Sequence, residues 1–247
     1  MTGLQEQLCL KALWIPSLNT FHLSTVKESK MIEKRLRLLG LLGVVSLLSY
    51  SAFVFISPFF YPGYDWLSSA VSDLCAADAP SLSVANRLNA LFGTCGVVSA
   101  TAVWVASARN RSKLLKSGVS SFLIMEWVCY VGYELFPWIS GDSSSSFGNI
   151  MHLLVTVLVV LFSILSMVLI ALSGKRSGIP SLSVWALSAL IMMTLGAIGT
   201  GVMPKAVFGL FERFSTFSTV IFNAILGLYL YWGKLTPSIP RENNPIS

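Results

Sequence analysis

Residues 150–172 read IMHLLVTVLVVLFSILSMVLIAL, a run that contains no Asp, Glu, Lys or Arg. The hydrocarbon core of a bilayer is about 30 Å thick, and about 20 helical residues cross it. A chain in hydrocarbon must satisfy its backbone hydrogen bonds internally, and a helix does so within one segment. This run therefore predicts a membrane-spanning helix, and it decides the class of fold.

The chain contains five further apolar segments of similar length, three before this run and two after it. Together they predict an all-α fold, a polytopic membrane helix bundle of six transmembrane helices. The predicted spans run from Leu38 to Phe60, Ser83 to Ala106, Val119 to Phe136, Ile150 to Leu172, Leu182 to Met203 and Phe214 to Trp232.

The composition agrees with this class. Hydrophobic residues make up 54% of the 247 residues and charged residues 11%, whereas an ordinary soluble domain has about 25% charged residues. The mean hydropathy is +0.73. These values exclude a disordered protein, a secreted disulfide scaffold and a cytosolic enzyme of ordinary composition.

The basic residues predict the orientation of the chain. Cytoplasmic loops of membrane proteins carry an excess of Lys and Arg, and alternate connections here collect 14 of the 17 basic residues. Both termini are therefore predicted to be cytoplasmic, and the pI of 9.3 reflects topology and not nucleic-acid binding. Only Arg87, Lys205 and Arg213 fall on the outer side.

The chain divides into three predicted regions: a cytoplasmic N-terminal extension (1–35), the six-helix domain (36–232) and a cytoplasmic tail (233–247). Residues 1–30 lack the basic start and apolar core of a signal peptide. Met31 begins a compact lead, MIEKRLR, into the first span. Residues 1–30 are either an extension ahead of a start at Met31 or a flexible tail.

The first outer loop carries the densest polar signal. Pro62-Gly63 is a turn signal, and the residues after it alternate with helical spacing. We predict a short amphipathic outer helix after the first span, which either plugs the end of the bundle or presents a polar site. Its apolar stripe is Leu67, Ala70, Val71 and Leu74, and its polar stripe is Asp65, Ser68, Ser69, Ser72 and Asp73.

Three positions near or within the spans carry candidate chemistry. Arg87 can extend toward the membrane surface or pair with Asp73 or Asp78. Glu126 lies inside the third span, where a carboxyl group is a functional candidate or joins helices by hydrogen bonds. His152, which opens the fourth span, is either a catalytic base or a helix-end histidine that bonds to the backbone or to a loop.

A Ser/His/Asp arrangement is available at the predicted outer face, with Ser72 as nucleophile, His152 as base and Asp73 as orienting group. One histidine near the membrane is too few for catalytic zinc, which usually has three protein ligands. We therefore predict no metal and no cofactor. The remaining polar residues of the outer rim are candidates for ligand binding: Ser68, Asp78, Arg87, Glu134, Asp142, Glu212 and Arg213.

The order of these motifs resembles the domain-of-unknown-function 998 family of six-span integral membrane proteins. The resemblance covers about residues 36–232 and implies six helices with an outward polar cluster, without an established activity, substrate or cofactor. The resemblance implies small residues near Glu126 and Glu134, where this chain has acids, so it assigns no role to these two glutamates. The matching motifs are Tyr61-Pro-Gly-Tyr64, Ser72-Asp73-Leu74, Pro80 with Asn86, Phe136-Pro137 followed by Asp142, His152, and Gly209-Leu-Phe-Glu-Arg213.

Three functions follow as expectations. The first is binding of a small molecule or lipid in an outward-facing polar pocket. The second is an intramembrane lipid hydrolase that uses Ser72, His152 and Asp73. The third is a structural or assembly subunit of a membrane complex. The expected partners are membrane lipids and a small-molecule or lipid ligand, while the oligomeric state and the particular membrane stay open.

Overall fold

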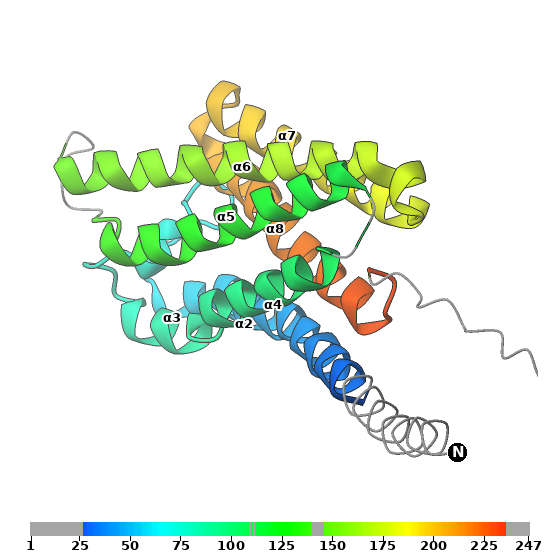
Figure 1. Ribbon diagram of the computed structural model, residues 1–247. Helices are drawn as coiled ribbons and strands as arrows, with labels where there is room; N and C mark the ends of the chain where they lie inside the picture. Colours follow the sequence, from blue (N-terminus) through cyan, green and yellow to red (C-terminus); the bar gives the residue numbers. More distant parts are fainter. Residues whose placement is uncertain (1–26, 109, 111, 140–145, 236–247) are drawn as a thin grey trace, which may run out of the picture. The chain divides into compact units, whose positions relative to one another are not determined.

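The computed structural model describes residues 27–108, 110, 112–139 and 146–235 (Figure 1). The chain forms two compact units, Met1–Leu36 and Arg37–Ser247. In the first unit the described residues, 27–36, are helical. Most of the predicted N-terminal extension, most of the C-terminal tail and the candidate Asp142 lie outside the described residues.

In the second unit, the described residues form α-helices joined by turns and short 3-10 helices, with no strand among them. The elements in chain order are α2 (Leu42–Ile56), η1 (Ser57–Phe60), η2 (Ser72–Cys75), α3 (Leu82–Asn89), α4 (Phe92–Ser107), α5 (Lys113–Leu135), α6 (Phe147–Ser177), α7 (Pro180–Val202), η3 (Lys205–Val207) and α8 (Phe208–Tyr231).

Six helical stretches of the described chain are long and apolar enough to cross a membrane, which confirms the six predicted spans. The sidedness of the termini stays a prediction. The stretches are Lys27–Phe60, Leu82–Ser107, Lys113–Leu135, Phe147–Gly174, Pro180–Val202 and Lys205–Tyr231.

Several helix ends follow from local sequence. The Ser112 hydroxyl accepts a hydrogen bond from Leu115 N at the start of α5, and the Ser146 hydroxyl accepts one from Asn149 N at the start of α6. Such side chains satisfy backbone donors that have no partner within the helix. Gly178, with φ +74°, ends α6 in the left-handed conformation that glycine adopts readily.

The second span is interrupted where one continuous helix was predicted. The break lies at residues 90–91, between α3 and α4. Two serines of α2 hydrogen-bond to carbonyls beside it: Ser49 Oγ donates to Leu88 O (2.6 Å), and Ser46 Oγ donates to Phe92 O (2.7 Å). These hydroxyls satisfy carbonyl groups in an apolar environment, where an unpaired polar group is costly.

The last helix, α8, lies at the centre of the second unit. It has the largest buried share of the six spans, and it packs against α7, α2 and α4. Figure 1 shows α5 and α6 running side by side, in agreement with their extensive contact. The central position of α8 brings its polar residues against loops and helices that are distant in sequence.

The predicted amphipathic helix after the first span is confirmed only over the single 3-10 turn of η2. Residues 66–69 form turns instead. Side chains take the backbone groups that a helix would pair: Asp65 accepts from Leu67 N, and Tyr64 donates to Ala70 O. Such local bonds compete with helix formation. Val71 and Leu74 are buried as predicted, whereas Leu67 is exposed.

Candidate functional site

The polar residues of interest lie at the end of the bundle that contains residues 61–81, residues 136–139 and the start of α8, here called the loop end. Hydrogen bonds join these segments directly. Ala77 N donates to Trp138 O (3.0 Å), and Leu210 N donates to Leu67 O (3.1 Å). The loop end is therefore one connected structure, although its parts come from three regions of the sequence.

Arg213 is the buried cation of the loop end, with 2% of its surface exposed. Its Nη1 donates to Gly209 O (2.7 Å) and Ser69 O (3.3 Å), and its Nη2 donates to Tyr64 Oη (2.6 Å). The guanidinium carbon lies 4.3 Å from the centre of the Trp66 ring, within range of a cation–π interaction. Arg213 thus holds the first loop against α8.

Two neighbours of Arg213 strengthen the same attachment. Glu212 Oε2 accepts a hydrogen bond from Val71 N (2.6 Å). Gly209 lies so close to the loop that an added Cβ would overlap Ser69 O and would lie 2.7 Å from Arg213 Nη1. Glu212 and Arg213, which are adjacent in sequence, each bond to the loop. We call Tyr64, Trp66, Gly209, Glu212 and Arg213 the loop anchor.

The other predicted ligand-binding residues occupy separate places at the loop end. Ser68 Oγ donates to Asp65 Oδ2 within the loop. Asp78, Arg87 and Glu134 are exposed. Arg87 forms no hydrogen bond or ion pair with any other described residue, so the predicted pairing with Asp73 or Asp78 is not formed.

Asp73 lies on η2 and is half-buried. Its Oδ2 accepts a hydrogen bond from Ala70 N (3.0 Å). Burial raises the pKa of Asp73, while the bond from Ala70 N and a side-chain bond from Trp138 oppose that change. Nearby, burial raises the pKa of the Cys75 thiol to about 11, so that thiol is protonated at neutral pH and is a poor nucleophile.

His152 lies on the first turns of α6, next to the segment that follows α5. Its Nδ1 lies 2.8 Å from Phe136 O. A carbonyl oxygen only accepts, so Nδ1 carries the proton and Nε2 of the neutral ring is an acceptor. The ring contacts Trp138 and Tyr133, with centroid distances of 5.6 and 4.8 Å.

Trp138 connects two of the three residues that were predicted as a catalytic set. Its side chain hydrogen-bonds to Asp73, and its ring packs against His152. No hydrogen bond among the described residues joins His152 to Asp73 or to the hydroxyl of Ser72. We call Asp73, Trp138 and His152 the Trp138 cluster; all three side chains are half-buried.

Sequence reasoning missed Trp138, because a single tryptophan after a span gives no sign of the side chains that it will contact. The available signal was Pro137, which ends the helical segment and precedes the tryptophan directly. In the described part of the chain, no group of three or more His, Cys, Asp or Glu side chains could hold a metal ion.

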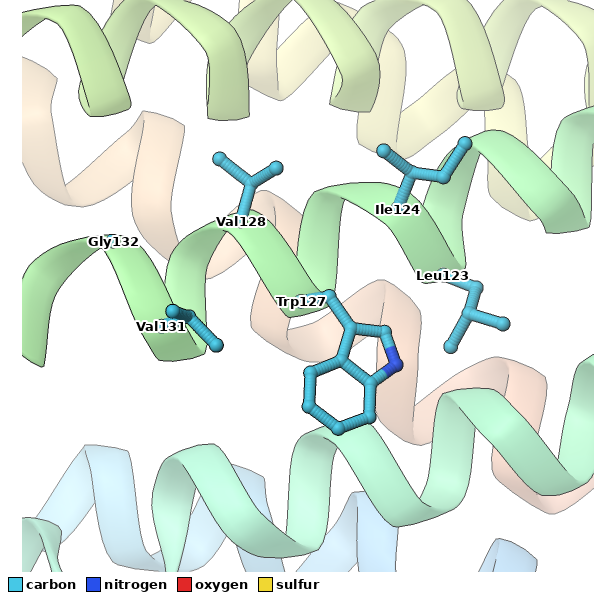
Figure 2. Close-up of a pocket in the computed structure, with 6 residues that line it drawn as sticks. All are labelled: Leu123, Ile124, Trp127, Val128, Val131 and Gly132. Atoms are coloured by element: carbon cyan, nitrogen blue, oxygen red, sulfur yellow. The ribbon is translucent and has the colours of Figure 1, made fainter.

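An apolar groove of about 480 Å³ lies along α5 and is shallow (Figure 2). Figure 2 shows Ile124 and Val128 on one side of the helix and Leu123 and Trp127 on the other. Its lining has the character of a lipid-facing helix surface, and it differs from the predicted polar pocket. The lining residues are Leu123, Ile124, Trp127, Val128, Val131 and Gly132.

Four polar residues of the third span, Glu126, Tyr130, Tyr133 and Glu134, form a stripe at helical spacing, but their contacts are unrelated. Tyr133 shares a hydrogen bond with Thr156 on α6 (3.0 Å), and Tyr130 accepts one from Thr94 on α4 (3.4 Å). Glu134 is exposed, whereas Glu126 is buried inside the bundle with 7% of its surface exposed. Glu126 is thus the one carboxyl of this stripe with a buried environment.

Comparison with models of protein families gives a match. A family described as "Protein of unknown function (DUF998)" matches residues 44–229, which is most of the six-span region. No curated protein matches, and no solved structure matches.

Proposed function

We propose that this multi-span membrane protein, which belongs to the family of proteins of unknown function DUF998, binds a small polar molecule or a lipid headgroup at the loop end. One observation supports the proposal: Asp73 and His152, from separate regions of the chain, both contact the half-buried ring of Trp138. The Trp138 cluster is the proposed contact surface.

The chemistry of the cluster favours a ligand that donates hydrogen bonds. An ionised carboxylate only accepts, and the Nε2 of neutral His152 also accepts, because its Nδ1 proton is bonded to Phe136 O. An indole ring adds an apolar face that attracts cations. An amine, an ammonium group or a hydroxyl-bearing headgroup meets these requirements.

In this proposal the loop anchor supports the binding site and does not bind the ligand itself. Arg213 and Glu212 are committed to the loop, so they shape the loop end and do not contact the ligand. We propose that the ligand approaches from the face that the positive-inside rule makes the outer one. Membrane lipids are the ligand source nearest to such a site.

Native mass spectrometry of the purified full-length protein tests the proposal. We expect a bound lipid or metabolite on the wild-type protein and a loss of most of that adduct in Asp73→Asn and His152→Ala. Asp65→Asn is the matched control, because Asp65 is exposed in the first loop and accepts hydrogen bonds from within that loop. Retention of the adduct in both cluster variants, each of which still unfolds cooperatively, would rule out the site.

A lipid hydrolase is the second candidate, and one observation favours it. The bond from His152 Nδ1 to Phe136 O fixes the ring with Nε2 as acceptor, which is the form a general base needs. Ser72 would be its nucleophile, although no described hydrogen bond joins the two residues. A serine-reactive fluorophosphonate probe should label the wild-type protein and not Ser72→Ala; equal labelling or none would reject the hydrolase.

A further inference from the structure

A second polar site lies inside the bundle, away from the loop end. It is formed by one residue from each of four helices: Ser46 of α2, Gly96 of α4, Glu126 of α5 and Asn223 of α8. Asn223 Nδ2 donates to Glu126 Oε1 (2.8 Å) and to Gly96 O (3.2 Å). Ser46 and Asn223 are at most 2% exposed, and Glu126 is 7% exposed.

Gly96 makes room for the carboxyl group. A Cβ added there would lie 2.9 Å from Glu126 Oε2 and 3.2 Å from Ser46 Oγ. Contacts under 3.0 Å require a neighbour to move, and here the neighbours are held by four packed helices. A side chain at position 96 would therefore displace the carboxyl group of Glu126, which occupies the space that glycine leaves.

Glu126 lies deep within its span. It is 13 residues from Lys113 and nine from Leu135, the ends of α5, or about 20 Å and about 14 Å at 1.5 Å per residue. An isolated carboxylate in such an apolar environment is costly and must be neutralised. No described Lys, Arg or His forms an ion pair or hydrogen bond with Glu126; its hydrogen-bond partner is the neutral amide of Asn223.

The geometry around Glu126 favours a proton over a divalent metal ion as the cation that neutralises its carboxylate. Divalent metal ions such as Ca²⁺ and Mg²⁺ require a shell of several oxygen ligands. Here Asn223 points its NH₂ group at both Glu126 Oε1 and Gly96 O, so the amide hydrogens occupy the oxygens that a metal would need. The reversed amide would place its oxygen against the carbonyl oxygen of Gly96, which can only accept, and this fixes the orientation.

We propose that Glu126 is an intramembrane proton-binding site, whose carboxyl group takes up and releases one proton inside the four-helix junction. Asn223 Oδ1 supports a polar site of this kind, because it is buried and has no hydrogen-bond partner; such an atom is normally satisfied by a further donor, for example a water molecule. The groups that α2, α4 and α8 present to the carboxyl do not titrate. Cys129, one turn along α5, adds a thiol.

Infrared spectroscopy of the full-length protein in lipid nanodiscs tests this proposal. At neutral pH we expect the C=O stretch of a protonated carboxylic acid, which shifts in D₂O. Glu126→Gln should remove the band, while Glu134→Gln should leave it, because Glu134 is exposed on the same helix. A band of unchanged intensity in Glu126→Gln, or the absence of any such band down to mildly acidic pH, would overturn the proposal.

Two further infrared measurements test whether the site binds a proton and whether Glu126 is the source of the band. Sodium or potassium added at constant pH should leave the band unchanged; loss of the band would assign a metal cation to the site in place of a proton. Should Glu126→Gln fail to fold, Asn223→Ser replaces the amide that bonds to the carboxyl. We expect Asn223→Ser to shift the band, and an unshifted band would count against Glu126 as its source.

Discussion

Arg213 shows how a polar residue of a membrane protein can be structural although its sequence context suggests a ligand site. The residue belongs to the outer rim by topology, yet its guanidinium donates to Tyr64 Oη and to two backbone carbonyls. It is also buried beneath the Trp66 ring. A buried charge with several hydrogen bonds orders the segments that supply them.

We expect Arg213→Gln to destabilise the protein by about 1–3 kcal/mol, the usual cost of leaving buried polar groups without partners. Thermal unfolding in detergent is the measurement. Arg87→Gln is the matched control, because it removes the same charge from an exposed residue at the same end and should change stability by less than about 0.5 kcal/mol. Equal effects of the two substitutions would contradict the anchoring role of Arg213.

Asp73 leads to a prediction about pH. Burial raises the pKa of Asp73 above its ordinary value, so the folded protein holds this proton more tightly than the unfolded chain. The resulting stability is complete below the unfolded pKa and is lost as the pH rises through the folded one. Asp73→Asn should remove this loss and raise the melting temperature at neutral pH relative to the wild-type protein.

Asp65 is the control for that measurement, because its pKa shift has the opposite sign. A hydrogen bond from Ser68 lowers the pKa of Asp65, with a further contribution from Leu67 N. Its stabilisation is therefore present above the unfolded pKa and is lost as the pH falls. Asp65→Asn should not raise the melting temperature at neutral pH. The same rise in both variants would indicate a general charge effect.

At the scale of the elements, the length of apolar runs predicted the spans well, but helical spacing predicted the first loop poorly. The spacing of Leu67, Val71 and Leu74 fits a helix, and two of these three residues are buried. The backbone nevertheless turns at residues 66–69, because side chains of the loop and of α8 take its hydrogen-bonding groups. A pattern of burial is visible in sequence, whereas partners from a distant helix are not.

The contact between α7 and α8 gives a prediction at this scale. A Cβ on Gly196 would overlap Ser215 N of α8 and lie 2.7 Å from Phe211 O, both backbone atoms. Gly196→Ala should therefore separate the helices and cost about 1–3 kcal/mol, as overpacking typically does. The measurement is thermal or denaturant unfolding of the purified protein.

Gly201 supplies the control on the same helix. Nothing lies within 4 Å of a Cβ built at this exposed position. Alanine has the higher helix propensity, so Gly201→Ala should be neutral or stabilising by up to about 1 kcal/mol. If both substitutions stabilised the protein, the close approach of α7 and α8 at Gly196 would be incorrect.

At the scale of the whole molecule, six spans require that successive connections alternate between the two sides of the membrane. The exposed residues Ala77 and Arg176 lie in connections that this alternation places on opposite sides. In intact cells or sealed organelles, a membrane-impermeant maleimide should label Ala77→Cys without permeabilisation, provided that the outer face is accessible. Arg176→Cys should require access from the cytosol. The unsubstituted protein gives the background, and labelling of both variants from the same side would refute the topology.

The sequence by itself determined the membrane class and the six spans, because these depend on a local property, the length of an apolar run. It also identified Asp73, Glu126, His152 and Arg213 as residues of interest. Their surroundings could not be inferred, because those depend on which helices pack together.

Only the tertiary structure decided what each of these residues contacts. Tyr64 and Arg213 are 149 positions apart, and Glu126 and Asn223 are 97 positions apart, yet each pair is joined by a hydrogen bond. The position of α8 at the centre of the bundle brings both pairs together. A buried polar group acquires its chemical role from the partners that packing gives it, and one chain position carries no information about a partner on a distant helix.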